Sequence, residues 1–224
     1  KLALGKQYGV LGFISSDLVE TVNDTSYIAL NYKSGLTTYA EGLRVYNNGN
    51  VGIGVAAPEA KLHISGRVYQ DGLGGSTFFG FGAGKADDLS SNYNSAFGYQ
   101  ALYINTTGAN NVATGFYALK SNTTGSSNTA SGYQALLSNA TGHNNTATGY
   151  LTFQSNTTGA LSTATGSEAL RFNTTGNYNT ASGFQSLYSN TTGDSNTASG
   201  RSSLYSNTTG RDNTAFGNNA QASA

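Results

Sequence analysis

The chain contains no cysteine, methionine or tryptophan, and Pro58 is its single proline among 224 residues. The lack of cysteine excludes disulfides, thiolate metal ligands and a cysteine nucleophile. Charged residues make up 10% of the chain, against about a quarter in typical soluble domains, and the formal net charge is zero. A neutral chain offers no field to attract nucleic acid or an anionic membrane. We therefore expect neither partner, and no membrane insertion, since no apolar run is long enough to span a bilayer.

What the chain has in abundance is glycine at a fixed spacing. One glycine recurs every seventeen residues, eight times without interruption, from Gly98 to Gly217. Such a period identifies a repeat array, in which each unit is stabilised by stacking on its neighbours. Polar composition alone would also fit disorder. The strict register favours a folded array instead.

Three zones follow from the composition. Residues 1–66 predict a small β-rich domain, residues 67–93 a Gly-rich transition, and residues 94–224 the repeat array. The array holds seven units over 94–212 and the start of an eighth. Strands are expected in the first zone at five segments: Gly9–Ser15, Ser26–Tyr32, Leu43–Tyr46, Val51–Gly54 and Lys61–Ile64. Within the transition, Phe78–Gly82 resembles a degraded first repeat.

Alignment of the units with one another shows which positions are constant. One column is always alanine and another is leucine or phenylalanine. We expect both columns to point into the interior, where small and large side chains stack repeatedly; their members include Ala113, Ala130, Ala147, Leu119, Leu136 and Leu187. Asparagine and threonine columns, such as those of Asn105 and Thr107, are equally constant, and the asparagines predict side-chain ladders or bonds to corner backbone groups.

Seventeen residues with two glycine positions do not suit a helical repeat, because glycine, asparagine and threonine are poor helix formers. They suit one coil of a parallel β-solenoid: a strand, a glycine turn, a second strand and an Asn-Thr-Thr-Gly corner. Each coil would rise by about 4.8 Å. The sequence therefore predicts an all-β chain, with a small N-terminal β-domain followed by a parallel β-roll of 17-residue coils.

The small number of apolar side chains in each coil indicates that the chain associates with other copies. A coil with one leucine, one alanine and part of a tyrosine has little to bury, so further apolar surface is expected to be covered by other chains. The expected seam is an aromatic column that also accepts polar residues and so lies outside the interior: Tyr99, Phe116, Tyr133, Tyr150 and Phe184. Because rod-like assemblies favour closed cyclic symmetry, we expect a homotrimeric fibre.

Two segments resemble known fibre proteins. The unit Asn-x-Ala-x-Gly, as in Asn128–Gly132 and Asn196–Gly200, resembles the head repeat of trimeric autotransporter adhesins, and the longer unit resembles repeats of mosaic adhesive trimer fibres of predatory bacteria. Residues 49–66 are similar to the NVGIG…P…KLHV segment of phage tail fibres. The resemblances cover about residues 47–66 and 94–217. They imply a left-handed β-roll, a trimer, an extracellular or virion surface and a role in adhesion, with no reaction and no cofactor.

Ligand binding is expected in the N-terminal zone, because exposed aromatic residues near charge are the usual contacts of sugars. Tyr32, Lys33, Tyr39 and Arg44 are the candidates for a cell-surface glycan or protein receptor. Three copies of one weak site would gain affinity through avidity.

Catalysis has less support. The two histidines, His63 and His143, lie in different zones and lack metal-site spacing. Acidic residues cluster at Asp17, Glu20 and Asp24, which leaves open a phage tail fibre or tailspike that cleaves polysaccharide through paired carboxylates. We expect no catalytic residues and no metal.

Ice binding by a threonine array is a minor alternative. We place the uniform threonine columns in the corner or beside the alanine column, not in a regular Thr-x-Thr strand pair.

Overall fold

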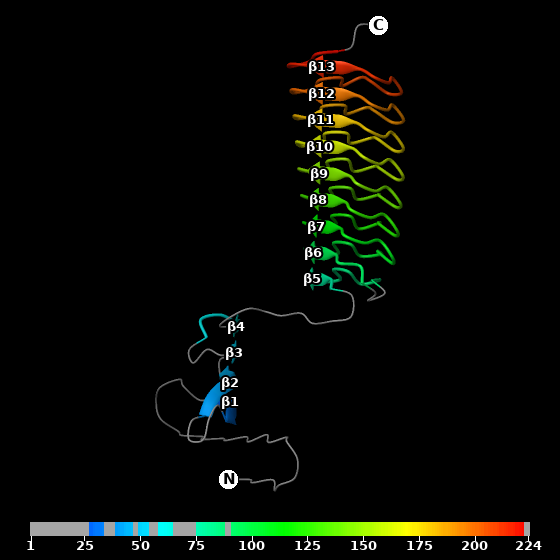
Figure 1. The fold of residues 1–224 in the computed structure, drawn as a ribbon. Coiled ribbons are helices and arrows are strands. Elements are labelled where there is room, and N and C mark those ends of the chain that lie inside the picture. The colour runs from blue at the N-terminus through cyan, green and yellow to red at the C-terminus, as the bar shows by residue number, and fades with distance from the viewer. Residues whose placement is uncertain are drawn as a thin grey trace. The chain divides into compact units, whose positions relative to one another are not determined.

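The computed structural model describes residues 27–33, 39–46, 49–53, 58–64, 75–87 and 91–221, and every regular element among them is a strand. The prediction of an all-β chain is confirmed for these residues (Figure 1). The chain divides into two compact units, Lys1–Tyr69 and Gln70–Ala224.

The first unit contains a four-stranded sheet in the order β1-β2-β3-β4. Its strands are β1 (Tyr27–Lys33), β2 (Tyr39–Tyr46), β3 (Val51–Ile53) and β4 (Leu62–Ile64). The first three are antiparallel in succession, whereas β4 pairs parallel to β3. Four of the five expected segments coincide with these strands, although β2 begins four residues before Leu43. The fifth, Gly9–Ser15, lies outside the described residues.

The second unit is a parallel β-solenoid, as the 17-residue period predicts (Figure 1). Its nine strands form one sheet in chain order: β5 (Thr77–Phe79), β6 (Ser95–Phe97), β7 (Val112–Thr114), β8 (Thr129–Ser131), β9 (Thr146–Thr148), β10 (Thr163–Thr165), β11 (Thr180–Ser182), β12 (Thr197–Ser199) and β13 (Thr214–Phe216). From β6 onward each residue pairs with the residue seventeen positions later, for example Ala113 with Ala130. β5 shows that Phe78–Gly82 does form a first coil.

The remainder of each coil differs from the prediction of a second strand. After the glycine, every second residue is left-handed: Gln100 has φ 51° and Leu102 has φ 50°. The backbone still bonds between coils, since the Gln100 N–H donates to the Phe81 carbonyl at 2.9 Å and the Leu102 N–H to the Ala118 carbonyl at 3.0 Å. A left-handed non-glycine residue costs about 1–2 kcal/mol. Burial of the leucine and these hydrogen bonds offset that cost.

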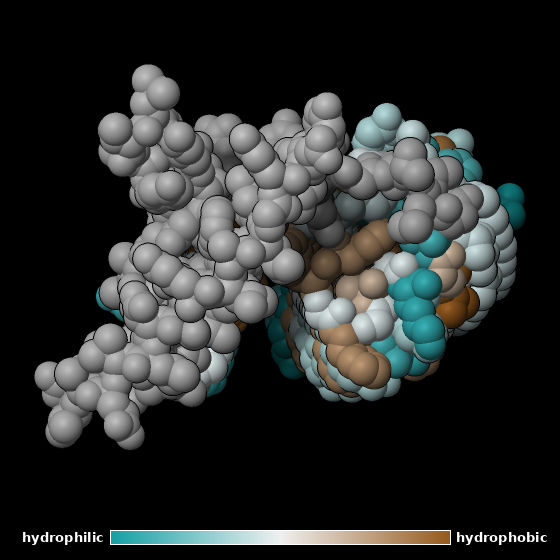
Figure 2. All heavy atoms as spheres, turned by 90° about the horizontal axis from the view of Figure 1, so that it is seen from below, coloured by the Kyte–Doolittle hydropathy of each residue, from teal (hydrophilic) through white to brown (hydrophobic). Residues whose placement is uncertain are grey.

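The interior is filled by the alanine and leucine columns. Ala113, Ala130, Ala147, Leu119, Leu136 and Leu187 are all 0% exposed. Phe153 occupies the leucine column in one coil and is equally buried. Figure 2 looks along the solenoid from its β5 end, and side chains of successive coils overlie one another in continuous rows.

The two glycine columns are required for different reasons. Gly149 has φ 136°, which other residues rarely adopt, and a Cβ there would lie 2.7 Å from the Gly166 carbonyl oxygen. Gly142 has no positive φ, but its Cβ would lie 2.8 Å from the Asn156 side-chain nitrogen. Both columns therefore mark places where adjacent coils approach too closely for a side chain.

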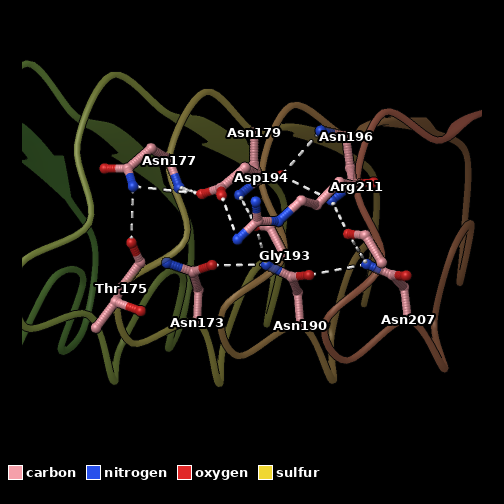
Figure 3. A network of polar contacts seen from close by, with 11 residues as sticks. Asn173, Thr175, Asn177, Asn179, Asn190, Gly193, Asp194, Asn196, Asn207 and Arg211 are labelled. Carbon is pink, nitrogen blue, oxygen red and sulfur yellow. Dashed lines mark hydrogen bonds and ion pairs between the residues drawn. The ribbon is translucent and has the colours of Figure 1, made fainter.

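Buried asparagines form two ladders along the solenoid, one of which is seen in Figure 3 through Asn173, Asn190 and Asn207. In that ladder each side-chain N–H₂ donates to the asparagine Oδ1 of the preceding coil and to a glycine carbonyl of its own coil. Asn190 does so at 2.7 Å to Asn173 and 3.0 Å to Gly193. The ladders thereby satisfy polar groups in the interior.

Candidate functional site

A ladder of stacked rings forms an exposed apolar feature along the described solenoid. Phe81, Tyr99, Phe116, Tyr133 and Tyr150 follow one another with ring centroids 5.1–5.5 Å apart and planes within 16° of parallel. The three inner rings are 39–42% exposed. We call these five residues the aromatic ladder. It contains four of the five residues expected in the trimer seam.

Phe184, the fifth of those residues, belongs to the same column but not to the stack. Ser167 occupies the intervening coil, and Arg201 follows on the other side. Phe184 is 43% exposed and makes no ring contact among the described residues. The ladder is thus continuous over the N-terminal half of the solenoid and interrupted beyond it.

The orientation of the rings limits what the ladder can bind. Parallel rings at these centroid separations are offset-stacked, so each face is partly covered by the next ring. A pyranose packs its C–H groups against an exposed aromatic face, which the inner rings do not offer. The exposed part of these rings suits a packing surface that follows the solenoid axis.

A cationic cluster lies on a second column, which the sequence analysis did not single out. The Lys85 Nζ donates to the Tyr103 hydroxyl at 3.0 Å, and the Lys120 Nζ lies 3.9 Å from the Tyr117 ring centroid. Tyr103 stands between the two lysines, with their Nζ atoms 5.1 and 5.9 Å from its ring centroid. The hydrogen bond that Lys85 donates to Tyr103, together with the charge interaction between them, raises the pKa of Lys85. Only the seventeen-residue offset between Tyr103 and Lys120 could have indicated this contact from sequence.

A shallow hollow of about 300 Å³ lies between three coils near the C-terminal end. It is lined by Asn177, Tyr178, Asp194, Ser195, Arg211 and Asp212. Figure 3 shows Asp194 between Asn177 and Arg211, accepting a backbone N–H of Asn177 at 2.8 Å and facing an Arg211 nitrogen at 3.4 Å. Ligand pockets are mostly apolar with few polar groups. This hollow is open and mostly polar, so it lacks the apolar walls that bury a small molecule.

The four candidate ligand-binding residues lie in β1 and β2, and their side chains lie outside what the structure describes. The backbone register places Tyr39 opposite Lys33, with Tyr32 adjacent along β1. Arg44 pairs with Ala29, beyond a register shift between Leu30 and Asn31. At about 3.3 Å per residue, Ala29 lies about 13 Å along the strand from Lys33. The register pairs Tyr39 with Lys33 and separates Arg44 from that pair, whereas Tyr32 pairs with Ala40 and alternates in face with Lys33.

The residues that could form a catalytic or metal site are spread over both units of the chain. His63 lies in β4 and His143 lies on the solenoid, in different units. In the parts of the chain that are described, no three His, Asp or Glu side chains gather as a potential metal site. The same residues include no apolar helix of membrane-spanning length. Asp17, Glu20 and Asp24 lie outside the described residues.

Comparison with known proteins found no family model, no curated protein and no solved structure that matches this chain.

Proposed function

We propose that this chain is a non-enzymatic segment of a homotrimeric surface fibre, which projects from a cell or virion and takes part in adhesion or recognition. The observation that carries the proposal is the aromatic ladder, an exposed apolar stripe running parallel to the axis of a regular solenoid. The other elements of the proposal are the stiffness of the rod, a seam between copies, and a recognition surface elsewhere on the chain.

Stiffness follows from the way the coils are joined. Each coil is bonded to its neighbours by short parallel strand pairing, by backbone bonds after the glycine, and by the asparagine ladders. The side chains between coils are buried alanines, leucines and asparagines in repeated positions. A rod held in this manner suits projection better than it suits chemistry, since successive described coils from β6 onward are joined at a constant 17-residue spacing.

The seam follows from geometry and surface chemistry. Three parallel rods can be related by a threefold rotation axis that runs parallel to the rods. A stripe that follows the rod axis then contacts the stripes of the other two copies along its full length. Tyr99, Phe116 and Tyr133 are still about 40% exposed in the isolated chain. Contiguous exposed apolar surface of this kind marks interaction sites. Contact between the aromatic ladders of neighbouring copies would bury this apolar surface.

Recognition is assigned to the N-terminal unit, where Lys33 and Tyr39 are a directly opposed backbone pair. A cell-surface glycan or protein receptor is the proposed ligand, bound through Tyr32, Lys33, Tyr39 and Arg44. Three copies of a weak site on one fibre would act multivalently.

The trimer is tested by sedimentation velocity and light scattering on the full chain. We expect a particle of three times the 23.1 kDa chain mass. Phe116→Ser combined with Tyr133→Ser should give a smaller species. The matched control is Tyr178→Ser, which removes a tyrosine that is 61% exposed but lies off the ladder. A folded wild-type monomer at micromolar concentration would refute the trimer.

Recognition is tested on a glycan array and on intact cells. Alanine variants of Lys33 and Tyr39 should bind more weakly than wild type, and no sugar should be released from capsular polysaccharide. Equal binding by these variants would remove the assigned ligand site, whereas sugar release would favour a depolymerase.

A further inference from the structure

The outward face of β8–β12 carries two parallel ranks of hydroxyl side chains, one on each side of the buried alanine column. The first rank is Thr129, Thr146, Thr163, Thr180 and Thr197; the second is Ser131, Thr148, Thr165, Ser182 and Ser199. The uniform threonine column thus lies beside the alanine column, and a Thr-x-Thr pair occurs in two of these five strands. β9 and β10 are both Thr-Ala-Thr, and the alanine between the threonines points inward.

In the described coils, the hydroxyls of these ranks make no hydrogen bond to the next coil, unlike those of one column of corner threonines. The Oγ1 atoms of Thr123, Thr157 and Thr174 each donate to a carbonyl of the next coil at 3.0 Å. Among the described residues, no side chain of the two ranks makes such a bond, and Thr163 and Thr165 are both exposed. The same residue type thus has a structural role in the corner and an unassigned one on the strand face.

We propose that this face, which we call the hydroxyl face, binds ice. This inference goes beyond the proposed adhesive function and concerns a different column of the coil from the aromatic ladder.

Its spacing supports an ordered water lattice as the ligand. Strand pairing sets the distance between coils at about 4.8 Å, and alternate residues on a strand lie about 6.7 Å apart. Water molecules in ice form tetrahedral hydrogen bonds of about 2.75 Å, which place second-neighbour oxygens about 4.5 Å apart and give a perpendicular repeat of about 7.3 Å. The mismatch is about 0.3 Å per coil along the solenoid and about 0.6 Å across each strand, so hydroxyls on three adjacent coils stay within about 1 Å of lattice positions.

The restricted side chains and the lack of charge on the hydroxyl face also favour a crystalline ligand. β-Branched threonine is restricted at χ1, so in the first rank, which is threonine throughout, the hydroxyl and methyl positions have little freedom to lose on binding. Neither rank contains a charged residue to hold liquid water around itself. A soluble ligand has no reason to match a face that repeats in two directions, whereas a crystal surface does.

The proposal is tested on the full chain by freezing-point hysteresis and by the shape of ice crystals grown in its presence. Thr165→Lys and Thr163→Lys place a charged, flexible side chain in the ranks. Thr175→Lys is the matched control, because Thr175 is an exposed corner threonine of the same coil. We expect wild type and Thr175→Lys to show hysteresis, and each rank variant to lose on the order of tenfold, equivalent to about 1.4 kcal/mol of surface binding.

Absence of hysteresis in the wild-type protein would overturn the proposal, as would rank variants that retain wild-type activity. Sedimentation of the same samples keeps this result separate from the trimer. A trimer without hysteresis would refute ice binding alone, and a monomer with hysteresis would refute the fibre alone.

Discussion

The side-chain nitrogen of Asn139 donates to Oδ1 of Asn122 in the preceding coil at 2.8 Å. The same nitrogen donates to the Gly142 carbonyl of its own coil at 3.0 Å, and the Asn139 Oδ1 accepts from Asn156 at 2.7 Å. Both Asn122 and Asn139 are fully buried. One amide group thus holds three coils and a corner together in a place that water does not reach.

Asn139→Ala should lower the free energy of unfolding by about 3 kcal/mol, because it removes three buried hydrogen bonds and leaves Oδ1 of Asn122 without the amide that donates to it. Urea unfolding followed by circular dichroism measures the change. Asn207→Ala is the control at the less buried end of the ladder, and it should cost clearly less. Equal costs at the two positions would show that the ladder stabilises through something other than buried hydrogen bonds.

Substitution of glycine separates backbone strain from steric clash. Gly149→Ala introduces a Cβ 2.7 Å from the Gly166 carbonyl oxygen at φ 136°, whereas Gly217 has φ 116° and nothing within 4 Å of its added Cβ. Gly217→Ala should therefore cost only the backbone strain, about 1–3 kcal/mol. Gly149→Ala should cost more, or prevent folding of the central coils. Thermal unfolding of both variants decides this, and similar melting temperatures would mean that the coils can move apart.

Much of the solenoid could be predicted because each column repeats. The spacing from Gly98 to Gly217 gives the coil length, and alanine or leucine at fixed phase identifies the interior. A single unit would not have been enough, since short apolar segments do not distinguish strand from turn.

The course of the chain after each glycine could not be predicted. Local preference disfavours a left-handed leucine, yet Leu102 has φ 50°, because bonds to the next coil and burial outweigh the local cost. The hydroxyl face was missed for a related reason. Thr174 and Thr163 are the same residue type, and only the fold determines which hydroxyl meets a carbonyl.

The N-terminal candidates show a different limit. Tyr32, Lys33, Tyr39 and Arg44 were selected by residue type, which carries no information on strand register. The register places Tyr39 opposite Lys33 and Arg44 opposite Ala29, so only part of the set is adjacent.

Ser167→Tyr should complete the aromatic column between Tyr150 and Phe184. Two new stacked pairs at about 0.5–1.5 kcal/mol each would raise the free energy of unfolding by about 1–3 kcal/mol. Ser206→Tyr is the control, since it adds an exposed tyrosine to a column whose neighbour in the preceding coil, Ser189, is not aromatic. Chemical unfolding compares the two variants. If they are equally stable, stacking contributes nothing beyond the area buried.

The last prediction concerns the proton of Lys85. Its hydrogen bond to the Tyr103 hydroxyl raises the pKa of Lys85, because the ammonium form is the form that the contact stabilises. Tyr103→Phe should therefore lower the pKa of Lys85 toward the ordinary value of lysine, measured by side-chain NMR titration. Tyr117→Phe, which alters the ring beneath Lys120, should leave the pKa of Lys85 unchanged.

The raised pKa of Lys85 makes the stability of the fold depend on pH. The folded pKa lies above the unfolded one, so the contribution of the contact is complete below the unfolded pKa and is lost as the pH rises through the folded pKa. The difference in stability between wild type and Tyr103→Phe should accordingly shrink at strongly alkaline pH. A Lys85 titration that is identical in the two proteins would show that the hydroxyl does not hold the ammonium group in solution.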